Sequence, residues 1–93
     1  MAPPTPTDPL AVALAALAAT LSDQRRAQRF LDLTGIGTDE LRLRAGEPAL
    51  LAALIGFLEA HEPDLLSVSE QIGVRADDLT AARRQLDIAR GEE

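Results

Sequence analysis

The sequence of 93 residues has no cysteine, tryptophan or tyrosine, and aromatic side chains are limited to Phe30 and Phe57. Without cysteine there is no disulfide, no cysteine-ligated zinc or iron–sulfur site and no thiol nucleophile. The single histidine, His61, lies in a predicted loop between two glutamates. Adjacent loop residues rarely converge on one atom, so a metal or acid–base site there is not expected. We therefore predict no catalytic, cofactor-binding or metal-binding residues and no enzyme activity.

Basic residues are also few, since 9 arginines face 15 acidic residues and the net charge is −6. This balance argues against general attraction to nucleic acid or to an anionic membrane. The longest apolar run, Ala49 to Leu58, is about half of the ~20 residues that a membrane span needs. No basic residue precedes the apolar stretch that begins at Leu10, whereas a secretory signal would have one. We expect a cytoplasmic protein that is not bound to a membrane.

The apolar periodicity predicts helices only. Leu10, Leu14, Leu17 and Leu21 have the i, i+4, i+7, i+11 spacing of one helix face, and no stretch alternates like a strand. Capping residues, prolines and glycines predict helix starts at Asp8-Pro9, Ser22 or Asp23, Thr38, Glu47-Pro48, Glu62-Pro63 and near Ala76, and ends at Gly35, Gly46, Gly73 and Gly91.

These signals predict an all-α fold, a compact bundle of five or six short helices. The bundle forms a single domain over residues 9–90, with an unstructured Pro/Thr-rich tail at 1–8 and an unstructured end at 91–93. Residues 49–58 are apolar on nearly every side, which is typical of a buried helix, so we place this helix at the centre of the core.

Two similar three-helix halves, roughly residues 10–45 and 47–88, are predicted from an internal repeat. Leu14–Leu17 matches Leu51–Leu54, and Gly35–Leu41 matches Gly73–Leu79 in the pattern Gly-[Ile/Val]-x-x-Asp-[Asp/Glu]-Leu. The glycine suits a helix end, the acids suit the next helix start, and the leucine suits the core, so the pattern is explained without any binding function. Coincidence in a chain rich in alanine and leucine is the alternative.

Arg25, Arg26 and Arg29 form a basic patch at the start of the second predicted helix. Arginine is enriched where proteins bind each other, and an acidic partner would fit such a patch. A solvated face that pairs with neighbouring acids is the competing interpretation. We predict a small non-enzymatic protein-interaction or regulatory module that binds a protein partner through these arginines, as a monomer or a homodimer.

The alternative function is that of a DNA-binding helix-turn-helix protein that uses the helix after Gly73. Residues 68–79 have the apolar and small-residue spacing of that motif, and Arg83 and Arg84 would contact phosphates. However, Asp77 and Asp78 stand in the turn that would approach the bases, where acids repel the phosphate backbone. Protein binding is therefore the preferred prediction.

Several segments in order also resemble a domain-of-unknown-function family of small alphaproteobacterial proteins that are all-helical. They are the stretch from Arg29 to Ile36 (RFLDLTGI), Asp39 to Arg42 (DELR), Pro48 to Leu51 (PALL), and Phe57-Leu58. The resemblance runs from Leu10 to Leu86, and Glu59-Ala60-His61-Glu62 departs from the acidic pair that follows phenylalanine-leucine in that pattern. It implies a helical fold and no particular activity.

Overall fold

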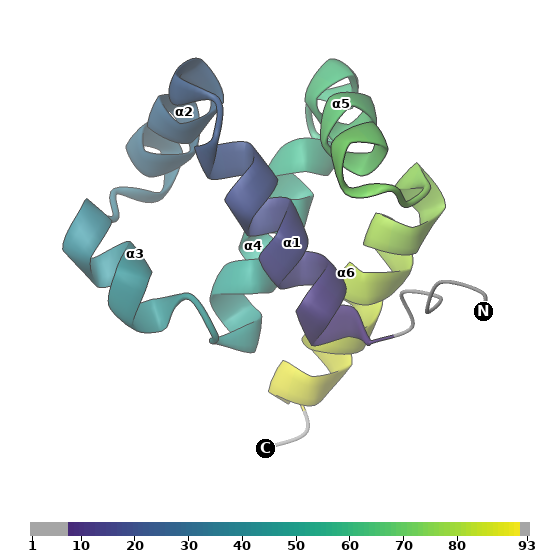
Figure 1. The fold of residues 1–93 in the computed structure, drawn as a ribbon. Helices are drawn as coiled ribbons and strands as arrows, with labels where there is room; N and C mark the ends of the chain where they lie inside the picture. Colours follow the sequence, from purple (N-terminus) through teal and green to yellow (C-terminus); the bar gives the residue numbers. More distant parts are fainter. Residues whose placement is uncertain (1–7, 92–93) are drawn as a thin grey trace.

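Six α-helices make up the computed structural model, which describes the backbone of residues 8–91 and the side chains of residues 8–88 (Figure 1). They are α1 (Pro9–Leu21), α2 (Gln24–Thr34), α3 (Thr38–Arg44), α4 (Pro48–Glu59), α5 (Glu62–Ile72) and α6 (Ala76–Gly91). No strand occurs among the described residues, which confirms the all-α prediction. The predicted unstructured segments lie outside the described residues except for Asp8, which caps α1, and Gly91, which is the last residue of α6.

The helix boundaries follow the local signals in the sequence. The side chains of Asp8 and Asp23 accept hydrogen bonds from the first turns of α1 and α2, at 3.0 Å each. Gly35 and Gly73 end α2 and α5 with φ of +72° and +78°, a left-handed conformation that other residues adopt at a cost. The predicted cap Thr38 is instead the first residue of α3, and the capping position is Gly37, which offers no side-chain oxygen.

The centre of the core is α4, as predicted from its apolar sequence. Leu51, Leu54, Ile55 and Leu58 are fully buried, and α4 packs against both α1 and α6. In Figure 1, α1 crosses in front of α4, with α2 and α3 on one side and α5 and α6 on the other. The other buried apolar side chains are Val12, Ala13, Ala16, Leu17, Ala19, Phe30, Leu41, Leu50, Ala52, Val68, Leu79, Ala82 and Leu86.

The two predicted halves agree in some features and differ in others. Their first two helices have 13 and 11 residues in one half and 12 and 11 in the other, and both second helices end at a left-handed glycine. Their third helices, however, have 7 and 16 residues. The internal duplication therefore stays a prediction.

The short helix α3 is held to the rest of the domain by little buried surface. Leu41 is its one buried residue, and α3 stands at the edge of the fold, apart from the central α1 (Figure 1). A short helix with a single buried side chain covers its neighbour incompletely. One opening in the packing lies between α1 and α3.

Candidate functional site

Arg26, one of the three arginines predicted to form an exposed patch, is buried. Only 8% of Arg26 is exposed. Its guanidinium donates hydrogen bonds to the Ala19 carbonyl oxygen at 3.3 Å and to the Ser67 hydroxyl at 3.3 Å, and its Nε donates to Asp64 at 3.4 Å. Arg26 thus joins α2 to the end of α1 and to α5. The prediction of three exposed arginines is wrong for Arg26, because its side chain fills a space between helices where it finds acceptors.

Arg29 also has interaction partners within the protein. It forms an ion pair with Asp64, and its guanidinium carbon lies 5.4 Å from the centre of the Phe57 ring. Phe57 packs edge-to-face against the buried ring of Phe30, with 5.4 Å between the ring centres. By contrast, Arg25 is exposed and has no carboxylate oxygen within 4.0 Å among the described residues. Of the predicted patch, Arg25 is the one arginine left fully available, and its role in partner binding stays a prediction.

The two arginines of the DNA-binding alternative differ in the same way. Arg83 pairs with Glu59 at 2.5 Å and with Asp87 at 3.0 Å, and the hydrogen bond that Arg83 donates to Glu59 raises the pKa of Arg83 above its ordinary value. A DNA phosphate would have to compete with both carboxylates. Arg84 is exposed, while Asp77, in the first turn of α6, has a side chain that is 91% exposed. The DNA-binding function stays a prediction.

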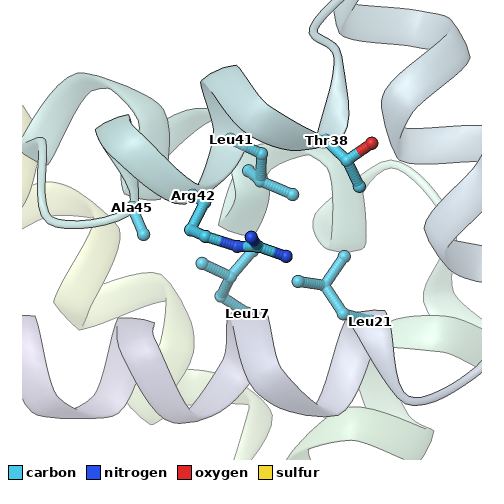
Figure 2. A pocket seen from close by; sticks show the side chains of 6 residues that line it. All are labelled: Leu17, Leu21, Thr38, Leu41, Arg42 and Ala45. Carbon is cyan, nitrogen blue, oxygen red and sulfur yellow. The ribbon is translucent and has the colours of Figure 1, made fainter.

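A groove lies between α1 and α3, which we call the α1–α3 groove. Its volume is about 250 Å³. In Figure 2, Leu17 and Leu21 point from α1 toward α3, and Leu41 points back toward α1, so three leucines face one another across the groove. The lining residues are Leu17, Leu21, Thr38, Leu41, Arg42 and Ala45.

Arg42 is the one charged side chain in this lining. Figure 2 shows it extending from α3 into the space between the two helices. It is exposed, and no carboxylate oxygen in the described part of the chain lies within 4.0 Å of its guanidinium. Its neighbour Arg44 is paired with Glu40 and Glu47, at 3.1 and 2.9 Å. The groove therefore combines an apolar lining with one cation that has no carboxylate oxygen within 4.0 Å in the described chain.

Leu17 and Leu21 of the groove belong to a row of four leucines on one face of α1, which we call the leucine edge: Leu10, Leu14, Leu17 and Leu21. Three of them, Leu10, Leu14 and Leu21, are 38–40% exposed, whereas Leu17 is buried. No residue of α1 is charged. The sequence pattern correctly grouped these leucines on one face, but it gave no sign that part of this face is left uncovered.

His61 stands at the start of α5, with an exposed side chain. Within residues 8–88 the structure has no group of three or more histidine, aspartate or glutamate side chains that could hold a metal ion. Over the same part of the chain, every helix is too short or too polar to cross a membrane. None of the candidate arginines has a hydrogen bond or ion pair with His61 among those described above.

Comparison with protein families gives a match that spans nearly the whole chain. Residues 6–89 match the model of a family described as Protein of unknown function (DUF3572). The chain belongs to DUF3572. This confirms the resemblance to a domain-of-unknown-function family, while its alphaproteobacterial range stays a prediction. Neither a curated protein nor a solved structure matches the chain.

The matched region includes every residue that lines the α1–α3 groove. The groove is therefore part of the DUF3572 region itself and not of an appended segment. The buried arginine Arg26 and its acceptors Ala19, Asp64 and Ser67 also lie within this region.

Proposed function

We propose that the chain is a small non-enzymatic protein-interaction module, and that its partner binds at the α1–α3 groove and the leucine edge. The observation that carries the proposal is the groove, an apolar recess of about 250 Å³ that shares Leu17 and Leu21 with the leucine edge on a helix without charge. Helix grooves with apolar linings are a recurring way in which proteins bind a segment of another protein. The proposal moves the predicted binding surface from the arginines of α2 to the α1–α3 groove and the leucine edge.

The energy that this surface offers indicates a transient interaction. Fully burying a leucine contributes about 1.5–3 kcal/mol. Since Leu10, Leu14 and Leu21 are each about two-fifths exposed, covering all three contributes about 2–4 kcal/mol. A partner side chain that fills the groove adds about 1.5–3 kcal/mol. The sum is close to the ~4–8 kcal/mol of millimolar to micromolar binding, before the cost of association.

Photo-crosslinking tests the proposal in cells of the native host. A photoreactive phenylalanine derivative at Leu21, which lines the groove, is expected to give one adduct with a partner protein. The matched control places the same group at Leu66 on α5, which is more exposed, 53% against 38%, and does not line the groove. Exposure alone would therefore favour adducts at Leu66.

Mass spectrometry of the adducts identifies the partner. Equal adducts at the two positions, or none at Leu21, would contradict the proposal, because a groove-bound partner must lie closer to Leu21 than to Leu66. A double substitution of Leu17 and Leu41 would not test the groove, because both residues are buried in the core and their loss would unfold the domain.

A further inference from the structure

We propose that the element which binds the α1–α3 groove is an acidic amphipathic helix of the partner protein. This helix places an apolar side chain in the groove and a carboxylate on Arg42. The inference rests on the proposed function and adds the chemistry of the partner to it. It is carried by the position of the Arg42 guanidinium, which lies at an apolar recess beside a helix without charged residues and has no ion pair with any described residue.

Charge complementarity selects an acidic partner. Arg42 extends into the groove, and the two acids of its own helix, Asp39 and Glu40, do not line it. Glu40 is already paired with Arg44 at 3.1 Å. A carboxylate from outside would meet a guanidinium with no competing acid within 4.0 Å in the described chain, at an apolar surface that excludes water once covered. Under these conditions an arginine–carboxylate pair is stronger than one that stays fully solvated.

The shape of the surface selects a helix over a small apolar acid. The leucine edge runs from Leu10 to Leu21, which is about 16 Å or three helical turns at 1.5 Å per residue. This length suits a helix with apolar residues at i, i+4 and i+7. Beside the leucine edge, α1 exposes only the small side chains of Ala11, Ala15 and Ala18, so another helix can approach closely. A fatty acid would fill the groove alone and leave Leu10 and Leu14 uncovered.

A second copy of the chain fits less well than a different protein. The matching surface on another copy is its own leucine edge, and α1 has no charged residue from Pro9 to Leu21. Contact between two such edges would cover Arg42 without giving it a carboxylate, at an energetic cost. Of the two predicted states, monomer or homodimer, the homodimer would therefore have to use another surface.

Two designed peptides test the inference by NMR on the ¹⁵N-labelled full chain. Both have about 16 residues, or about 24 Å as helices, with leucines at i, i+4, i+7 and i+11. Glutamates flank the leucines in one peptide and lysines in the other. The acidic peptide is expected to shift the amide signals of Leu17, Leu21 and Leu41 saturably, and the basic peptide to bind about tenfold or more weakly.

Charge reversal at Arg42 is the decisive step. Arg42→Glu is expected to weaken the binding of the acidic peptide about tenfold and to strengthen the binding of the basic peptide, because the sign of the local charge changes. The matched control is Arg84→Glu, which makes the same charge change at an exposed arginine of α6, on the other side of α1 from α3. It is expected to leave both affinities nearly unchanged. The spectra of the variants also show that each is folded.

Three results would overturn the inference. The first is equal binding of the two peptides, and the second is an equal effect of Arg42→Glu and Arg84→Glu. The third is that octanoate alone shifts the groove signals while neither peptide does, which would indicate a small apolar acid as the ligand. If Leu21 nevertheless crosslinks to a partner, the interaction module stands and only the acidic helix fails. If crosslinking fails as well, both proposals fall.

Discussion

Replacing Arg26 with alanine is expected to lower the free energy of unfolding by about 2 kcal/mol, because this arginine is a structural link and not a surface charge. Its three hydrogen bonds, to Ala19, Asp64 and Ser67, measure 3.3–3.4 Å. That is longer than the usual ~2.9 Å, so each contributes near the low end of the ~0.5–1.5 kcal/mol range. Together with the lost packing of the aliphatic stem, these contacts add up to about 2 kcal/mol.

The estimate stays below the ~3–5 kcal/mol that is typical when one partner of a buried ion pair is removed. Two of the acceptors keep another partner when Arg26 is removed. Asp64 keeps its ion pair with Arg29, and the Ala19 carbonyl oxygen still accepts a hydrogen bond of 2.7 Å from the Ser22 hydroxyl. A loss above about 4 kcal/mol would mean that Asp64 becomes an uncompensated buried charge after all.

Urea denaturation followed by circular dichroism measures this loss. The matched control is Arg25→Ala, one residue away on the same helix, which is expected to change stability by less than about 0.5 kcal/mol because Arg25 is exposed and makes no ion pair in the described chain. An Arg26→Met variant keeps the apolar stem and separates packing from hydrogen bonding. If Arg26→Ala costs no more than Arg25→Ala, the buried link is refuted and the two arginines are equivalent surface charges.

Four further substitutions test the fold. Gly73→Ala is expected to cost about 1–2 kcal/mol in thermal denaturation, because Gly73 has φ of +78°, although no atom beyond its two chain neighbours lies within 4 Å of the added Cβ. Gly56→Ala, inside α4 and also without a close contact, is expected to raise stability by about 0.5–1 kcal/mol in the same assay. Leu54→Ala should cost about 3–4 kcal/mol in urea, because Leu54 is fully buried in the core. The hydrogen bond that the Arg26 backbone N–H donates to Asp23 lowers the pKa of Asp23 below its ordinary 3.8. The ionised Asp23 therefore stabilises the folded state fully above pH 3.8, and this stabilisation is lost as the pH falls through the lowered pKa. Asp23→Asn should weaken the acid dependence of the unfolding free energy between about pH 2 and 5, and an unchanged dependence would contradict this role.

Most of the fold could be predicted because its helix boundaries depend on short-range chemistry. The aspartate caps, the prolines in the first turns and the left-handed glycines act within a few residues, so they are readable in the sequence. The burial of α4 was readable for a related reason, since a helix that is apolar on every side has no face for water. How well α3 covers α1 was not readable, because it depends on the length and direction of α3 after Gly35.

The arginines of α2 show why charged residues that lie close together in the sequence need not form an exposed patch. Arg26 stands four residues before the buried Phe30, and residues at this spacing share a helix face. This four-residue spacing was the one signal in the sequence that Arg26 faces the core. Its acceptors Asp64 and Ser67, however, are 38 and 41 residues away along the chain. No local pattern could show that they meet the guanidinium.

The case for Arg42 is stronger in an acidic chain than it would be in a basic one. With 15 acidic residues for 9 arginines, counter-charges are in surplus, and Arg26, Arg29, Arg44 and Arg83 each lie within 3.4 Å of a carboxylate oxygen. Scarcity of acids therefore does not explain why Arg42 has none in the described chain. Arg42 lies instead among the leucines, threonine and alanine that line the groove. An isolated guanidinium at an apolar recess keeps its full capacity to bind a carboxylate, which Arg26 has already used within the fold.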